Sequence, residues 1–327
     1  MKYGLGKGWM GILFAILMII TFGFAYNSVQ SNTICLAWQK AFGIEPATMG
    51  IALTALTLLI IFGGIHRVAK FSSTVVPVMA IIYLLIAVGV VIWNITSLPR
   101  VLLTIVEKAF GFNQAAGGVL GVTVIQGIKR GLFSNEAGEG SAPNAAAVAT
   151  VSHPVKQGLI QALGVFTDTL VVCSCTAFII LMSGVDVTAS NGIQLTQDAL
   201  THEIGSIGNP FVAVMIWLFA FSSIIGTYYY GETNVRYIKD SKLGVFIYRL
   251  AVAAMVMIGA VVSLDFAWSF ADITMALLTL CNLVAIVLLS RQAVFLLQDY
   301  RQQKKEGKNP VFSKDKMPEI ADQLEAW

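Results

Sequence analysis

The sequence predicts an all-α integral membrane protein, and its composition, hydropathy and apolar runs support this prediction. Of the 327 residues, 57% are hydrophobic and only 12% are charged, whereas a soluble domain carries about 25% charged residues. The mean hydropathy is +0.77. The apolar residues gather in long runs, and a helix that crosses a bilayer needs about 20 such residues. A soluble globule of this length would need far more polar surface.

The apolar runs are long enough to predict about eight transmembrane helices. They occupy residues 9–38, 47–64, 68–94, 117–150, 157–183, 209–230, 244–264 and 270–293. These runs form one transmembrane domain over residues 1–297, followed by a polar, basic C-terminal tail over 298–327. Within that tail we expect a short amphipathic helix around residues 317–327.

The distribution of lysine and arginine predicts the orientation, because cytoplasmic segments carry the excess of positive charge. If the N-terminus is cytoplasmic and the runs alternate, all but three of the 21 cationic residues lie inside. The three on the outside are Lys40, Arg100 and Lys108. Both termini are therefore expected in the cytoplasm, with an even number of crossings.

The fourth run, residues 117–150, does not have the composition of an ordinary spanning helix. It contains seven glycines together with Lys129, Arg130, Glu136 and Glu139. An ionisable group at the bilayer centre costs about 3 kcal/mol on insertion scales, so such a segment must pack within protein or line a wet cavity. We predict a discontinuous helix broken at residues 125–127, as in the substrate and ion sites of secondary transporters. The alternative is a glycine-rich cytoplasmic loop, above all for residues 131–143.

A single acid, Asp168, lies about halfway along the fifth run, between Thr167 and Thr169. Intramembrane ionisable residues are candidates for function by default. Asp168 can ligate a cation or pair with Lys129 or Arg130, and the structural alternative is a hydrogen bond to a neighbouring helix.

Other polar groups lie inside the first and sixth runs. Ser222 and Ser223 supply adjacent hydroxyls that suit sodium, although serine also bonds the carbonyl one turn back. Asn27 and Gln30 share one helix face, which suits either a pocket wall or a contact between helices.

Several classes of function are disfavoured. The sequence contains no phosphate-binding loop, and no histidine falls in mid-run to act as a catalytic base. Cationic residues are scattered except in the last forty residues, which argues against nucleic-acid binding. We therefore expect neither an enzyme nor an organic cofactor.

Several motifs resemble the alanine or glycine:cation symporter family, also called the sodium:alanine symporters. The most specific is GLFSNEAGEGSAP at 131–143, and HPVKQG at 153–158, GVFTDT at 164–169, YYGE at 229–232 and LEAW at 324–327 support it. The resemblance covers essentially the whole chain. Glu139 is a departure, because the family usually has an apolar residue there.

The resemblance implies a LeuT-type fold of two five-helix inverted repeats. The eight runs then resemble core helices three to ten, and we expect the chain to be truncated at its N-terminus, before the first two core helices. It also implies site residues. The break would supply pocket backbone at Val124, Ile125, Gln126 and Gly127. Sodium ligands would come from Thr123, Thr167, Asp168, Ser222 and Ser223, and pocket walls from Phe24, Asn27 and Phe221.

The implied function is sodium-coupled symport of alanine or glycine into the cell by alternating access. The expected partners are a small neutral amino acid, sodium as the coupling ion and the lipid bilayer of the inner membrane. The open alternatives are a non-transporting fragment of such a symporter, proton coupling in place of sodium, and a channel.

Overall fold

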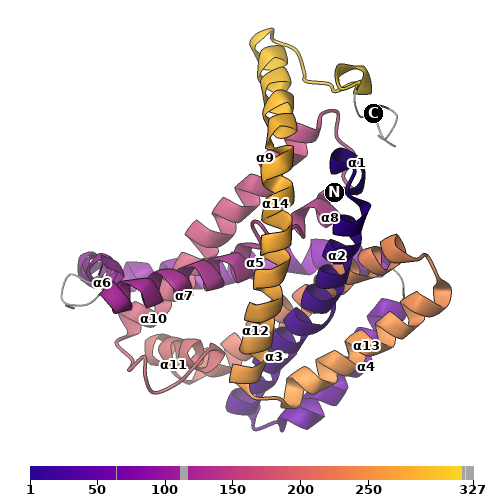
Figure 1. The fold of residues 1–327 in the computed structure, drawn as a ribbon. Helices are drawn as coiled ribbons and strands as arrows, with labels where there is room; N and C mark the ends of the chain where they lie inside the picture. The colour runs from indigo at the N-terminus through magenta and orange to yellow at the C-terminus, as the bar shows by residue number, and fades with distance from the viewer. Residues whose placement is uncertain (64, 111–116, 319–320, 322–327) are drawn as a thin grey trace.

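The computed structural model describes residues 1–63, 65–110, 117–318 and 321, and every regular element in this part of the chain is helical (Figure 1). The α-helices are α1 (Lys2–Leu5), α2 (Gly8–Met18), α3 (Tyr26–Phe42), α4 (Pro46–Phe62), α5 (Ile65–Trp93), α6 (Leu98–Phe110), α7 (Gly117–Asn135), α8 (Ala142–Ala146), α9 (Pro154–Phe166), α10 (Ser174–Ser183), α11 (Ile193–Ile204), α12 (Gly208–Ile238), α13 (Lys242–Val261) and α14 (Leu264–Lys305). The short 3₁₀ turns are η2 (Ile95–Ser97), η4 (Gly205–Ile207) and η5 (Lys314–Lys316).

Two of the long helices each contain a π-helical segment. Segment η1 (Ile19–Ala25) joins α2 to α3, and η3 (Thr167–Cys173) joins α9 to α10. A π-helical turn shifts the helix face by one residue and frees backbone groups, and it frequently marks a functional site. The predicted residues Phe24 and Asp168 lie inside these two segments.

Five helical spans in the described residues are long and apolar enough to cross a membrane: Gly8–Phe42, Pro154–Ser183, Ile193–Ile238, Lys242–Val261 and Leu264–Lys305. A sixth is added if Pro77–Trp93 and Ile95–Phe110, bent by 73° at their junction, form one span. The prediction of an all-helical membrane protein is confirmed at this level. The count of eight stays a prediction, because the described residues supply five or six such spans, and α4, with 17 residues, is apolar but shorter.

Helices α3 and α12 lie at the centre of the molecule. Helices α13 and α4 run side by side along one flank, and α5, α10 and α11 lie on the other side of α12 (Figure 1). Ile34, Phe221 and Val256 from α3, α12 and α13 are fully buried together in one apolar cluster. Gly259 lets α13 approach α3 closely, because a Cβ there would lie 2.6 Å from the Ser28 Cα and carbonyl oxygen.

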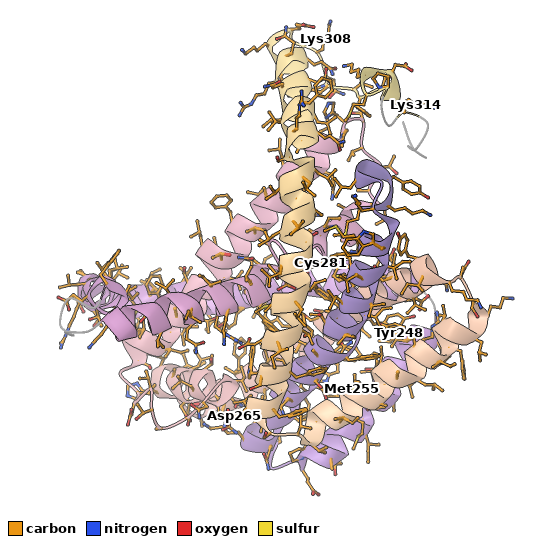
Figure 2. All side chains as sticks on the ribbon, in the orientation of Figure 1. Tyr248, Met255, Asp265, Cys281, Lys308 and Lys314 are labelled. Carbon is orange, nitrogen blue, oxygen red and sulfur yellow. The ribbon has the colours of Figure 1, made fainter. Side chains whose placement is uncertain are left out.

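The longest helix, α14, runs past the rest of the molecule from Asp265 toward Lys308 (Figure 2). The boundary predicted at residue 297 lies inside this helix. Beyond it the chain folds back, and the Phe312 amide donates to the Ser152 carbonyl at 2.8 Å. His153 is fully buried between the rings of Tyr300 and Phe312. Most of the amphipathic helix predicted around residues 317–327 lies outside the described residues.

The fourth predicted run is interrupted, but not where the sequence predicted. Helix α7 continues unbroken through residues 125–127 and ends at Asn135. The interruption is the connection Glu136–Ser141 between α7 and α8, where Glu136, Gly138 and Gly140 have φ values of 54°, 98° and 90°. Left-handed backbone at these three positions ends the helix, whereas a glycine within a helix costs only about 1 kcal/mol and α7 tolerates several.

Candidate functional site

A cavity of about 1220 Å³ lies beside the connection Glu136–Ser141. Its walls come from α1 and α2, the end of α7, α8, α9, η3, the second half of α12 and the middle of α14. Most of its lining is apolar, and its polar groups include Glu136, Asp168, Asn234 and Asn282. A largely apolar cavity with a few convergent polar groups is the usual form of a small-molecule site.

Asp168 lines this cavity from η3. Its Oδ2 accepts a hydrogen bond from the Ser134 hydroxyl at 2.6 Å, and the next residue, Thr169, accepts one from the Asn135 amide at 2.9 Å. These two bonds attach η3 to the end of α7. The structure thus places the predicted acid next to the interrupted segment, where one carboxylate oxygen is hydrogen-bonded and the group borders open space.

The two acids of the connection Glu136–Ser141 face different ways. Glu136 lines the cavity, whereas Glu139 is fully buried and accepts a hydrogen bond from the Tyr26 hydroxyl at 2.7 Å. This connection lies outside the described spans. Burial raises the pKa of Glu136 to about 7, and the charge of Asp168 adds to the rise. Burial also raises the pKa of Glu139 to about 8, against the lowering effect of the Tyr26 hydrogen bond.

Asn27 joins α3 to α12. Its amide nitrogen donates to the carbonyls of Phe22 and Gly23, at 3.0 and 2.9 Å, which belong to the π-helical segment η1. Its side-chain oxygen accepts from the Thr227 hydroxyl at 2.9 Å. In this conformation the fully buried Asn27 therefore serves as a contact between helices.

The predicted serine and threonine ligands bond to their own helices. Ser222 and Ser223 both donate to the Phe219 carbonyl, at 2.8 and 3.1 Å. Thr167 donates to the Leu163 carbonyl at 2.9 Å. Ser223 nevertheless lies one turn before Thr227, the residue whose hydroxyl contacts Asn27. The Thr227 hydroxyl is also 2.8 Å from the Ser223 carbonyl oxygen, to which it donates.

The α7 residues predicted as pocket backbone lie on an exposed stretch of regular helix. Val124 and Ile125 are 51% and 53% exposed, and Thr123, Gln126 and Gly127 are exposed as well. Regular helix keeps the backbone carbonyls in intrahelical hydrogen bonds. The expectation that a break here opens backbone groups is therefore wrong for this conformation.

The two aromatic residues predicted as pocket walls lie in separate apolar clusters. Phe221 is fully buried and stacks on Trp217, with ring centroids 5.5 Å apart. Phe24 packs near Tyr248, at 6.3 Å between centroids. The structure therefore does not bring Phe24 and Phe221 together.

The two cations of α7 pair with a different acid from the one expected. Lys129 Nζ lies 3.2 Å from Asp272 Oδ2, and Arg130 also forms an ion pair with Asp272. The Arg130 guanidinium lies 4.1 Å from the centre of a Trp268 ring. The suggested pairing with Asp168 is replaced by this contact with α14.

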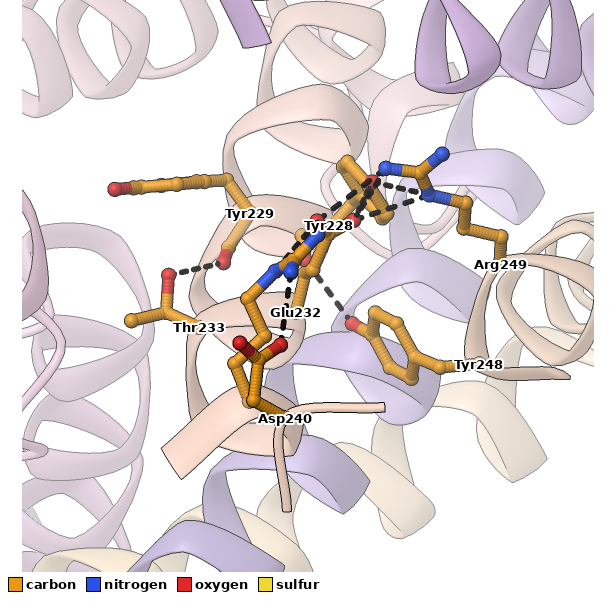
Figure 3. Close-up of polar contacts among 8 residues, drawn as sticks. Tyr228, Tyr229, Glu232, Thr233, Asp240, Tyr248 and Arg249 are labelled. Atoms are coloured by element: carbon orange, nitrogen blue, oxygen red, sulfur yellow. Dashed lines mark hydrogen bonds and ion pairs between the residues drawn. The ribbon is translucent and has the colours of Figure 1, made fainter. Parts of the chain in front are cut away.

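A second acidic group, Glu232 of α12, is enclosed by donors (Figure 3). Arg249 of α13 donates to Glu232 Oε2 at 3.1 Å, and Arg236 donates to Oε1 at 2.8 Å. The Tyr228 hydroxyl is a further donor to Glu232. This network fastens α12 to α13, and Glu232 is the last residue of the YYGE motif at 229–232.

Sequence reasoning missed Tyr26 and Thr227 as partners of site residues. Thr227 is four residues after Ser223, a spacing that places both on one helix face and was available in the sequence. Tyr26 gave no local signal, since its partner Glu139 is 113 residues away.

The apolar spans, the interrupted segment and the acids beside a cavity define a multi-pass helical membrane protein with a polar site inside. A sequence model described as the sodium:alanine symporter family matches residues 1–314, and the chain belongs to that family.

The similar proteins are transporters rather than enzymes. The chain is 53% identical over 316 residues to the probable sodium/glutamine symporter GlnT of Bacillus subtilis, covering 96% of this chain and 66% of that protein. It is 51% identical over 324 residues to the amino-acid carrier protein AlsT of Bacillus subtilis, covering 99% and 69%. It is 34% identical over 316 residues to the sodium/alanine symporter AgcS of Methanococcus maripaludis, covering 94% and 68%. The chain thus spans about two thirds of the length of these relatives.

Proposed function

We propose that this chain acts in the symport of a small neutral amino acid, alanine or glycine, with sodium. The observation that carries the proposal is the family match over residues 1–314. The cavity beside the interrupted segment, with Asp168 on its wall, supports it. A carboxylate in an apolar wall attracts a hard monovalent cation, and a π-helical segment there supplies a backbone that is not fully committed to regular hydrogen bonds.

Sodium would act by linkage. If sodium and the amino acid bind the same conformation better than the alternative one, each raises the apparent affinity of the other by the same factor. The sodium gradient then drives the amino acid inward by alternating access. Asp168 is the first candidate ligand, with Thr123, Thr167, Ser222 and Ser223 engaged after rearrangement of the helices that carry them.

We further propose a LeuT-type arrangement in the inner membrane, with both termini cytoplasmic and the runs corresponding to core helices three to ten. Two observations support the placement of both termini on the cytoplasmic side. Helix α1 contacts α14, so the N-terminus lies near the cationic C-terminal half of that helix (Figure 1). The lysines and arginines also concentrate in the segments assigned to the inside.

A second candidate solute is glutamine, because a relative 53% identical to the chain is named a probable sodium/glutamine symporter. The experiment is uptake of labelled alanine into proteoliposomes that contain the full chain, with an inward gradient of sodium or of choline. Uptake is expected with sodium only. Unlabelled glycine or glutamine should reduce the uptake of labelled alanine if the protein also binds that amino acid. Equal uptake in choline would exclude sodium coupling, and no uptake in either medium would favour the non-transporting alternative.

A further inference from the structure

Glu139 is a buried acid without a counter-charge. Its side chain is fully buried, its Oε1 accepts from the Tyr26 hydroxyl, and its Oε2 has no hydrogen-bond partner among the described residues. No lysine, arginine or histidine in the described part of the chain forms an ion pair with it. An ionised carboxylate in such a place is costly unless it is paired, and the group neutralises instead.

The backbone holds this acid in place. Glu136 is the one non-glycine residue with a positive φ in the described chain, and Gly138 and Gly140 flank Glu139 in the same region of φ. The Asn282 amide donates to the Gly138 carbonyl at 2.7 Å. A Cβ on Gly140 would lie 2.6 Å from the Phe14 ring. Strained backbone of this kind costs about 1–3 kcal/mol per residue and persists where the surroundings impose it, often at functional sites.

In the described part of the chain, the two ionisable groups that interact with Glu139 are both acidic. The Tyr26 hydroxyl faces Glu139 from α3. The charge of Glu136, in the same connection as Glu139, opposes ionisation of Glu139. Asp272 of α14 interacts electrostatically with Tyr26. The charge of Asp272 is itself compensated by ion pairs with Lys129 and Arg130. Helix α2 contributes the apolar Phe14. Burial and the charge of Glu136 therefore favour the neutral acid, and together they outweigh the Tyr26 hydrogen bond, which favours the carboxylate.

We propose that Glu139 is a proton-binding site, which exchanges its proton with the cavity through Glu136. In this conformation Glu139 carries the proton, and its carbonyl oxygen accepts from Tyr26. When the proton leaves for solvent, the carboxylate has no cation to pair with, so the ionised form favours an arrangement that opens the connection Glu136–Ser141 to water or to a cation. The binding site does not depend on the transported solute, whereas its effect on transport rests on the function proposed above.

The direct test is infrared spectroscopy of the full chain in lipid. A protonated carboxyl has a C=O absorption that an ionised carboxylate lacks. We expect this absorption in neutral buffer and its loss in strongly alkaline buffer. In neutral buffer Glu139→Gln should keep only the weaker absorption of the partly protonated Glu136. Glu45→Gln, which changes an exposed glutamate, should match the unmodified protein. An absorption of the same size in Glu139→Gln as in the unmodified protein would overturn the assignment.

Tyr26→Phe provides a second test that keeps the acid and removes its donor. A C=O group that loses a hydrogen bond absorbs at higher frequency, so the absorption should shift upward in this variant. An unshifted absorption would contradict the assignment even if Glu139→Gln failed to fold.

Uptake measured against pH completes the test. The pH dependence should flatten in Glu139→Gln, and unchanged dependence would disprove the link to transport. If the unmodified protein takes up no amino acid, the proposed function fails, while the infrared result still decides whether Glu139 binds a proton.

Discussion

Two glutamates, Glu232 and Glu139, are both removed from solvent but have opposite surroundings. Glu232 receives hydrogen bonds from Arg236, Arg249 and Tyr228 (Figure 3). Glu139 receives one, from Tyr26, and its second oxygen is unpaired. A carboxylate that is saturated by cations can only hold helices together, whereas an unsaturated one can change its protonation state. The comparison separates a structural acid from one suited to function.

The largest effect should come from Glu232→Gln. Removing one partner of a buried ion pair leaves the other charge uncompensated, which costs about 3 kcal/mol or more. Arg249, only 20% exposed, would be left without its carboxylate. Thermal unfolding in detergent should show a large fall in melting temperature.

The matched control for Glu232→Gln is Asp240→Asn. Asp240 is 76% exposed and pairs with the same Arg236, and surface substitutions change stability by about 0.5 kcal/mol or less. Equal losses in the two variants would show that burial does not distinguish Glu232.

The second effect is the pH dependence of stability that Glu139 contributes. Because the pKa of Glu139 is raised to about 8 in the folded chain, its proton is bound more tightly there than in the unfolded chain. The stability that it contributes is fully present below about pH 4.5, the ordinary pKa of a glutamate, and is lost progressively as the pH rises to about 8. The melting temperature of the unmodified protein should fall over this range, and Glu139→Gln should flatten the curve. A curve of the same slope in both proteins would place the titrating group elsewhere.

The third effect concerns Asp168, which lies between these extremes because it borders the cavity and its donors, the Ser134 hydroxyl and the Cys173 thiol, are both uncharged. In Asp168→Asn the side chain keeps its size and an acceptor oxygen but loses its charge. The apparent affinity for sodium in uptake assays should weaken tenfold or more, about 1.4 kcal/mol. Asp186→Asn, on an exposed loop, is the control and should leave it unchanged. An unaltered sodium dependence in Asp168→Asn would make Asp168 a structural partner of Ser134.

The sequence predicted a helical membrane protein because apolar runs report burial or membrane contact directly. It did not predict α6 and α11, which lie between the apolar runs. It misplaced the break in the fourth run, since Gly127 looks like a helix breaker but sits in regular helix, whereas the helix ends where Glu136 adopts a left-handed conformation. The composition of a segment does not reveal that a glutamate in it has a positive φ.

The candidate site was predictable only where one residue carries the signal. Asp168 stands out as an acid in an apolar run, and the structure places it on the cavity wall. Partners depend on which helices pack together, so neither the pairing of Lys129 and Arg130 with Asp272 nor that of Tyr26 with Glu139 follows from spacing.

The smallest effect should come from the contact between Asn27 and Thr227, which involves no charge. Thr227→Val keeps the shape of the side chain and removes the hydroxyl that bonds Asn27 Oδ1 at 2.9 Å. Loss of one neutral hydrogen bond in a buried place costs about 1 kcal/mol, so the melting temperature should fall slightly. Ser222→Ala is the control, because the Ser222 hydroxyl bonds the Phe219 carbonyl of its own helix and joins no second helix.

If Asn27 is also a pocket residue, Thr227→Val should raise the KM for the amino acid as well, since the freed amide oxygen would reorient. A fall in stability with unchanged KM would confine Asn27 to holding α3 against α12, and a larger loss in Ser222→Ala would contradict the ranking.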